Sequence, residues 1–287
     1  MRLIAPVLLI FAFWAVYPKF GLAGPYNCAS QNQEHVMPEA GANVETSLQD
    51  ISLTILYDNN PYQKGLDTGW GFSCLIQGTE KTILFDTGGN GSILLNNMQK
   101  LGLSPLEIDL VVLSHCHGDH VGGLFYFLRE NPKVCVYLPD SFPADFKSRI
   151  KAQKARVRSL SGPEPICRDV YSTGPLGNTL QEQSLIIDTD RGLIIITGCA
   201  HPGIIKIVEK TKDLISDELL LVLGGFHLLG ESGYGLNTII SRLRKLGVQA
   251  VGPCHCSGPV ARELFRKEWK DSYIDVGVGR VITATDL

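Results

Sequence analysis

Histidine and aspartate gather in one short segment of the chain. Residues 114–120 have the sequence SHCHGDH, which places three histidines and one aspartate close together. Imidazole and carboxylate side chains together suit Zn²⁺, iron or Mn²⁺. One histidine alone would favour a polar loop in which Asp119 only caps the next helix, but this spacing favours a metal site. We therefore expect metal binding by four residues of this segment: His115, His117, Asp119 and His120.

Further polar residues follow other expected strands. Asp86 lies in the sequence LFDTG, and His201, His227 and His255 lie in GCAHPG, GGFHL and PCHCSG. Each signal is weak alone, because a histidine beside glycine is more often an ordinary loop residue than a ligand. Their repetition is informative, since open α/β folds gather their ligands at the carboxyl ends of strands.

The elements that must position these residues are short strands alternating with helices. We expect strands at 51–57, 71–76, 81–86, 109–115 and 133–138, and helices at 92–101, 119–129 and 142–157. A hairpin around 188–192 is followed by helices at 202–212, 234–246 and 259–269 and by strands at 218–223, 249–253 and 273–284. This mixture predicts packed β-sheets flanked by helices.

Length and composition narrow the class of protein. The chain has 287 residues, of which 44% are hydrophobic, and a net charge of −3. There is enough apolar material for a full core, which excludes a disordered chain. A nucleic-acid binder usually carries a strong basic excess, which is missing here. We expect a small-molecule substrate and no nucleic-acid partner.

The first residues have the pattern of a secretory signal peptide. Arg2 precedes an apolar run at 3–16, and the small residues Gly21 and Ala23 favour cleavage after Ala23. This predicts export to the periplasm or the extracellular space, with residues 24–49 as a polar N-terminal arm and 50–287 as the folded domain. The alternative is an uncleaved membrane anchor at 3–16, although this run is shorter than the ~20 residues that span a bilayer.

The chain contains eight cysteines, and export would permit disulfides. Four of them lie beside the motif histidines: Cys116, Cys199, Cys254 and Cys256. If a disulfide forms, we expect it among the others: Cys28, Cys74, Cys135 and Cys167. Neighbours on an extended backbone point to opposite faces, so Cys254 and Cys256 should point away from a site that His255 enters. Thiolate ligands to a metal are the alternative.

Taken in order, these motifs resemble those of the metallo-β-lactamase fold superfamily. LFDTG, HCHGDH, His201 and His255 match its motifs over roughly residues 50–285. The other motifs are more similar to a subgroup that includes archaeal dihydropterin–ribofuranosylaminobenzene phosphate synthases and proteins labelled only metal-dependent hydrolases. The resemblance implies an α+β fold, an αββα sandwich of two mixed β-sheets flanked by helices, with the site along one edge of the sheets.

The resemblance also implies a set of ligands for one or two divalent metal ions. One ion would be held by His115, His117 and His201, and a second by Asp119, His120 and His255. Asp86 would orient ligands from behind them. Zn²⁺ is the expected ion, with iron and Mn²⁺ as alternatives. Many members bridge the ions with an aspartate in a Gly-Asp pair, where this chain has Gly224-Gly225, so tight coupling of two ions stays open.

The function we expect is a metal-dependent hydrolase acting on a small phosphoester, ester or lactone. The metal would activate a water that Asp119 orients, and His227 would protonate or hydrogen-bond the developing oxygen. One alternative is a transferase that joins a pterin-methyl diphosphate to an aromatic amine, as in the archaeal synthases. The signal peptide argues against it, because such intermediates are cytosolic. A non-enzymatic metal or ligand binder is a further alternative.

Overall fold

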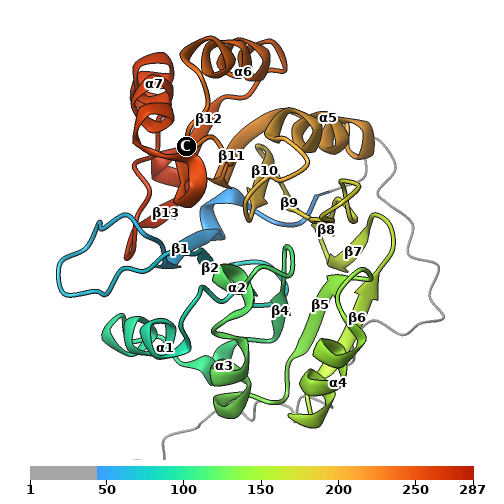
Figure 1. Cartoon of the computed structure of the whole chain (residues 1–287). Coiled ribbons are helices and arrows are strands. Elements are labelled where there is room, and N and C mark those ends of the chain that lie inside the picture. The colour runs from blue at the N-terminus through green and yellow to red at the C-terminus, as the bar shows by residue number, and fades with distance from the viewer. Residues whose placement is uncertain (1–43) are drawn as a thin grey trace, which may run out of the picture.

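Two β-sheets pack face to face at the centre of the structure, and helices cover their outer faces (Figure 1). This computed structural model describes residues 44–287. The seven-stranded sheet has the order β13-β1-β2-β3-β4-β5-β6, and the six-stranded sheet has the order β12-β11-β10-β9-β8-β7. Both sheets mix parallel and antiparallel pairs. The expected αββα sandwich is confirmed.

The strands and helices follow one another along the chain in a regular alternation. The strands are β1 (Ser52–Tyr57), β2 (Ser73–Gln77), β3 (Ile83–Phe85), β4 (Leu110–Val112), β5 (Cys135–Pro139), β6 (Arg156–Leu160), β7 (Glu164–Cys167), β8 (Val170–Ser172), β9 (Leu185–Thr189), β10 (Gly192–Thr197), β11 (Leu219–Gly225), β12 (Ala250–Cys254) and β13 (Val281–Thr283). The α-helices are α1 (Gly91–Lys100), α2 (Gly118–Val121), α3 (Leu124–Glu130), α4 (Ala144–Ala152), α5 (Ile204–Leu214), α6 (Gly233–Lys245) and α7 (Pro259–Trp269).

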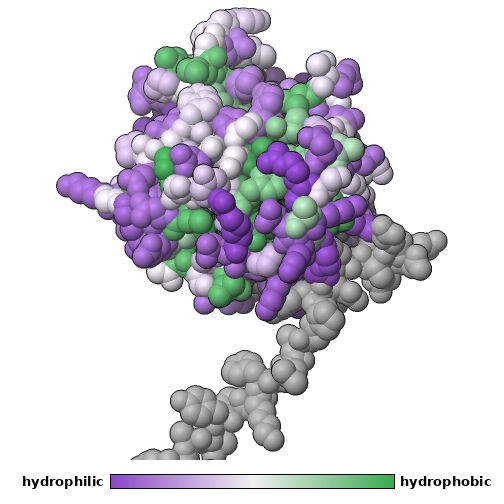
Figure 2. Space-filling model, turned by 60° about the horizontal axis from the view of Figure 1, so that its bottom comes forward, coloured by the Kyte–Doolittle hydropathy of each residue, from purple (hydrophilic) through white to green (hydrophobic). Residues whose placement is uncertain are grey.

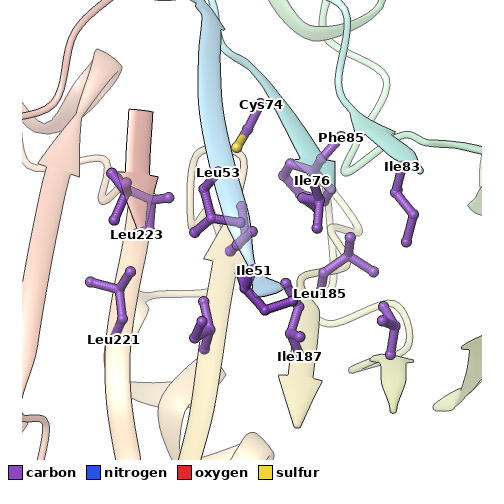
Figure 3. Close-up of a cluster of buried hydrophobic side chains, with 14 of the residues drawn as sticks. Ile51, Leu53, Cys74, Ile76, Ile83, Phe85, Leu185, Ile187, Leu221 and Leu223 are labelled. Carbon is purple, nitrogen blue, oxygen red and sulfur yellow. The ribbon is translucent and has the colours of Figure 1, made fainter. Parts of the chain in front are cut away.

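Three apolar layers hold the sandwich together. The central layer lies between the sheets, where Leu53 and Phe85 of the first sheet face Ile187 and Leu223 of the second (Figure 3). One outer layer packs α1, α3 and α4 against the first sheet, and the other packs α5, α6 and α7 against the second. Strands buried on both faces account for the continuous apolar runs of the sequence.

The parallel strands bring the motif residues to one edge of the sandwich. Strands β3 to β6 run parallel in the first sheet, and β10 to β12 run parallel in the second. The segments that follow the carboxyl ends of five of these strands contain the motif residues Asp86, His115, His201, His227 and His255. Topology alone therefore gathers residues that are far apart in the sequence.

The predicted helix over 119–129 is two helices, α2 and α3, which meet at Gly122-Gly123. The chain there passes against the loop that follows β3. A Cβ atom on Gly123 would lie 2.1 Å from the carbonyl oxygen of Thr87, and one on Gly122 would lie 2.3 Å from that of Gly89. This close approach needs two glycines, and they end the short helix that carries His120.

The predicted helix over 142–157 was too long at its carboxyl end. Helix α4 ends at Ala152, and Lys154, with a φ of 68°, turns the chain into strand β6. Strand β6 pairs only with β5, so this edge strand keeps its arginine side chains partly exposed. The strand was not predicted because charged residues are common at a sheet edge and interrupt the apolar pattern of a strand. Strands β7 and β8 were also missed, and only β13 forms a strand within 273–284.

The segment just before β1 packs onto the folded domain. The backbone N–H of Thr46 donates to Asp169 at 2.9 Å, and that of Leu48 donates to Asp190 at 2.8 Å. The signal peptide, the alternative anchor and residues 24–43 of the predicted arm lie outside the described residues. Among residues 44–287, no helix has the length and apolarity needed to cross a bilayer.

The surface and the cysteines complete the description of the domain. On the face shown in Figure 2, hydrophilic residues surround several separate hydrophobic patches.

Of the cysteines predicted to favour disulfides, Cys74 and Cys167 carry free thiols, and Cys135 is disulfide-bonded.

Replacing Gly123 by alanine should destabilise the fold, because the added methyl group meets the backbone oxygen of Thr87. We expect Gly123→Ala to lower the free energy of unfolding by about 1–3 kcal/mol, measured by urea denaturation with chelator present. Gly233→Ala is the matched control, since a Cβ there meets open space. Equal stability of the two variants would contradict the packing described.

Candidate metal centre and active site

Three histidine rings meet where the loops after β4 and β10 converge. The donor nitrogens of His115, His117 and His201 lie within 4.8 Å of one another. The Nε2 atoms of His115 and His201 are buried and have no hydrogen-bond partner. A buried polar atom without a partner costs free energy, and a cation between the rings would remove that cost. The donor set therefore fits a divalent metal ion.

A second group of donors lies beside the first. Asp119, His120, Cys199 and His255 offer ligand atoms that all lie within 4.8 Å of one another. A carboxylate oxygen of Asp119 is 3.3 Å from Nε2 of His255 and 3.7 Å from Nε2 of His120. Nε2 of His255 is buried and without a hydrogen-bond partner. This group also fits a divalent metal, and it contains one residue, Cys199, that was not assigned to it from the sequence.

Asp86 lies behind the candidate ligand His120. Its buried carboxylate accepts hydrogen bonds from the backbone N–H and the hydroxyl of Ser114, both at 2.7 Å, and lies 2.7 Å from Nδ1 of His120. Burial raises the pKa of Asp86 to about 7, against the effect of the Ser114 hydrogen bonds, which favour the charged form. The contact leaves Nε2 of His120 directed at the second group of donors.

Glu182 is the support that sequence reasoning missed. Its buried carboxylate accepts the backbone N–H groups of Cys199, Ala200 and His201 at 2.8–2.9 Å and the hydroxyl of Thr197 at 3.1 Å. The loop that carries His201 is therefore fixed by one side chain. Nothing in the sequence pointed to Glu182, because the surrounding residues, LQEQS, have the composition of an ordinary polar loop.

Gln183, the next residue, fixes the other histidine loop. Its side-chain amide donates to the carbonyl oxygen of Leu113 at 2.8 Å, and its backbone N–H donates to that of Ser114 at 3.0 Å. The two neighbours thus tie the loop after β4 to the loop after β10. The segment between β8 and β9 positions both halves of the three-histidine group.

His255 is held by the end of strand β1. Its backbone N–H donates to Asp58 at 3.2 Å, and its Nδ1 is 2.9 Å from the side-chain oxygen of Asn59. Burial raises the pKa of Asp58 above its ordinary value. The Trp70 ring packs against the other side, with its centroid 4.9 Å from that of His255. These contacts direct Nε2 of His255 toward Asp119, and none of them was predicted.

The ionisation states of the cluster suit metal binding. Burial lowers the pKa of His115 and His120 to about 3 and that of His201 to about 4. These rings are therefore neutral near pH 7, which is the form that binds a metal. Burial alone would raise the pKa of Asp119, but its close contact with His255 and the electrostatic effect of His120 hold that pKa well below its usual range.

His227 lies beside the three-histidine group rather than within it. Its ring centroid is 4.4 Å from that of His201, and its side chain is exposed. Its backbone has a φ of 53°, and its N–H donates to the sulfur of Cys256 at 3.3 Å. An exposed imidazole next to a metal ligand is available to a substrate.

The prediction that both late cysteines point away from the site was wrong for Cys256. Cys254 is fully buried, but Cys256 forms a third group of donor atoms with Cys199 and His227. The reason is local, because His255 has a φ of 46° and begins a 3-10 turn (His255–Ser257). The alternation of an extended strand ends there. Cys116 is exposed.

A cavity of about 420 Å³ opens next to His201. Residues 176–180 form one wall, and Pro202 and Lys206 form the other. It therefore borders the three-histidine group on the side that contains the start of helix α5.

Comparison with known proteins gives one consistent result. A family model described as the metallo-beta-lactamase superfamily matches residues 69–209. The chain is 30% identical to the 7,8-dihydropterin-6-methyl-4-(beta-D-ribofuranosyl)-aminobenzene-5'-phosphate synthase of Methanocaldococcus jannaschii, over 80% of this chain and 95% of that protein. The chain belongs to the metallo-β-lactamase superfamily. The resemblance to the synthase subgroup is also confirmed.

Solved structures of the superfamily agree with this assignment. Tm1679, described as a metal-dependent hydrolase of the β-lactamase superfamily, aligns with a TM-score of 0.71 and 26% identity over 82% of this chain and 99% of its own. YhfI from Bacillus subtilis aligns with a TM-score of 0.62 over 81% of this chain and 98% of its own, but at 14% identity it shows the fold alone. The superfamily fold binds divalent metals, and the two donor groups are the candidate ligands in this member.

Glu182→Gln should weaken metal binding at the three-histidine group, because a neutral amide turns a donor toward the backbone N–H groups that the carboxylate accepts. We expect about a 10- to 100-fold loss of zinc affinity, measured by competition with a chromophoric chelator. Glu209→Gln is the control, since Glu209 makes only a surface ion pair with Arg242 in the described structure. Equal affinities for Glu182→Gln and the unchanged protein would show that this carboxylate does not position the ligands.

Proposed function

We propose that this protein is a metal-dependent hydrolase acting on a small phosphoester, ester or lactone. The observation that carries the proposal is the pair of buried, unpartnered Nε2 atoms of His115 and His201, which meet His117 beside a cavity. A metal held by three protein ligands keeps a position for water or substrate, as catalytic sites do. The likeness to Tm1679, which is described as a hydrolase, supports the same reaction class.

The side chains around the donor groups divide the work of hydrolysis. Bound divalent metal supplies Lewis acidity, which lowers the pKa of water from 15.7 towards ~7 and polarises a phosphoryl or carbonyl oxygen. The carboxylate of Asp119 belongs to the second donor group and would accept a hydrogen bond from the attacking water. The exposed imidazole of His227 donates a proton to the leaving oxygen. Asp86 and Glu182 hold the ligands in place and touch no substrate.

The cavity beside His201 favours a phosphoester within this range of substrates. Lys206 is the cationic side chain among the residues that line it, and no acidic side chain lines it. Lys206 also lies in the first turn of helix α5, where the backbone N–H groups favour an anion. A phosphoryl group of the substrate would therefore be bound here, next to the three-histidine group.

A transferase is the second candidate, and the relative at 30% identity favours it. In that case the protein would join a pterin-methyl diphosphate to an aromatic amine, and the metal would stabilise the diphosphate leaving group. The predicted signal peptide argues against this, and we propose instead that the protein is exported and acts outside the cytosol. Condensation activity of the full chain, together with cytosolic retention, would favour the transferase. A non-enzymatic binder ranks last, because storage does not require an open position at the metal.

Removal of the metal should abolish turnover. We expect the purified full chain to contain bound metal and to hydrolyse generic phosphoesters, lactones or carboxylic esters, and chelation should reduce the rate to background because the bound metal activates the water. Readdition of zinc, iron or manganese should restore the rate. Bound metal without chelator-sensitive turnover on any of these substrates would contradict the proposal.

Lys206→Ala should weaken the binding of phosphoesters without changing the metal centre. We expect KM to rise several-fold, on the order of 1 kcal/mol for an ion pair of an exposed lysine, with unchanged metal content. Lys210→Ala, one turn further along α5, is the matched control and should leave KM unchanged. Equal KM values for both variants would exclude Lys206 from substrate binding.

A further inference from the structure

The end of strand β11 has no room for a carboxylate. This is the position at which many superfamily members have a bridging aspartate and this chain has Gly224-Gly225. A Cβ atom on Gly225 would lie 2.4 Å from the carbonyl oxygen of Gly198 and 2.7 Å from the sulfur of Cys256. The space beside Gly225 is therefore filled by a cysteine side chain and by the loop that contains Cys199.

Cys199 points its sulfur into the second donor group. Its side chain is buried, and its sulfur lies 3.1 Å from Nε2 of His120. Because Nδ1 of His120 faces the Asp86 carboxylate, Nδ1 holds the proton and Nε2 presents its lone pair to the sulfur. Nε2 of His255, buried and unpartnered, belongs to the same group. Several lone pairs thus face one point, an arrangement that a cation stabilises.

We propose that Cys199 is a thiolate ligand of the metal held by Asp119, His120 and His255. The proposal rests on the metal centre and does not require the hydrolase reaction. With Cys199 the second group has four protein ligands, which is the number found in closed tetrahedral sites. A soft thiolate among them favours zinc over manganese.

The two ligand sets imply different roles for the two metal ions. The closed group offers no position for a substrate, whereas the three-histidine group keeps one open. The cavity lined by Lys206 lies next to His201, on the side of the open group. The exposed His227 lies near both groups, because its ring is close to His201 and its donor atom lies within 4.8 Å of the Cys199 sulfur. Substrate therefore engages the metal at His115, His117 and His201, and the thiolate-bound metal has a supporting role beside it.

Cys256 provides a rival position for the sulfur ligand. Its sulfur accepts the N–H of His227 and lies 3.7 Å from the carbonyl oxygen of Cys199, within the third donor group. A metal held by Cys199, His227 and Cys256 would require both cysteines. The proposed site requires only Cys199, so substitution of each cysteine separates the two arrangements.

Cobalt substitution tests the proposal. The full chain loaded with two equivalents of Co²⁺ should show a near-ultraviolet thiolate-to-cobalt charge-transfer band. Cys199→Ser should lose this band and retain one cobalt per chain, whereas Cys256→Ser and the exposed-site control Cys116→Ser should keep both. Loss of the band in Cys256→Ser, or two bound cobalt ions without any band in the unchanged chain, would overturn the proposal.

X-ray absorption of the zinc-loaded unchanged chain gives an answer that does not depend on the folding of a variant. We expect a zinc–sulfur distance of about 2.3 Å, with about one sulfur for every two zinc ions. Nitrogen and oxygen ligands alone would overturn the proposal. Both readouts are independent of turnover, so a thiolate signal without hydrolysis would count against the proposed function and leave this inference standing.

Discussion

The whole site depends on one pair of neighbouring side chains that ties two loops from different sheets together. Glu182 holds the loop after β10 through the backbone N–H groups of residues 199–201, and Gln183 holds the loop after β4 through Leu113 and Ser114. Metal ligands must stand at defined distances from one point, and two loops on separate sheets do not reach that precision unaided. A buried carboxylate that accepts several hydrogen bonds is rigid, because breaking any of them leaves an unpaired polar group inside the protein.

Other histidines of the two donor groups are also held in place by hydrogen-bond partners on the side away from the metal. Asp86 directs His120, and Asp58 and Asn59 direct His255, so each of these rings has one nitrogen fixed by the protein and the other facing the donor groups. Burial keeps the histidines neutral, which leaves their lone pairs free for a cation. The arrangement explains why buried nitrogens are left without partners in an otherwise well-satisfied core. The site is also asymmetric, since the cavity is lined by His201 of the three-histidine group and by no residue of the second group.

The candidate ligands could be proposed from the sequence because the chemistry of a metal site lies in the residue types and their spacing, and the structure brings these residues together. Residues 114–120 have the composition and spacing of a metal site. Since His201, His227 and His255 each follow an expected buried strand, the sequence indicates that these later segments lie at the same edge of the sheets. The residues that hold the histidine loops in place could not be predicted in this way. Glu182 and Gln183 lie in a polar stretch of sequence, and the backbone groups that they bind lie far away in the chain. Cys256 was misjudged because a left-handed residue, His255, breaks the alternation on which the prediction relied. Strand β6 was not predicted because its arginines are unusual in a strand, and they are accommodated here because β6 lies at the edge of its sheet.

The central claim is that this edge of the sandwich holds two metal ions in two distinct donor groups. Anomalous X-ray diffraction from crystals of the zinc-loaded chain, recorded on both sides of the zinc absorption edge, tests it most directly. The account predicts two peaks, one enclosed by His115, His117 and His201 and the other by Asp119, His120, Cys199 and His255. A zinc ion bound elsewhere, or empty donor groups in a chain that retains its fold and was crystallised with excess zinc, would contradict it.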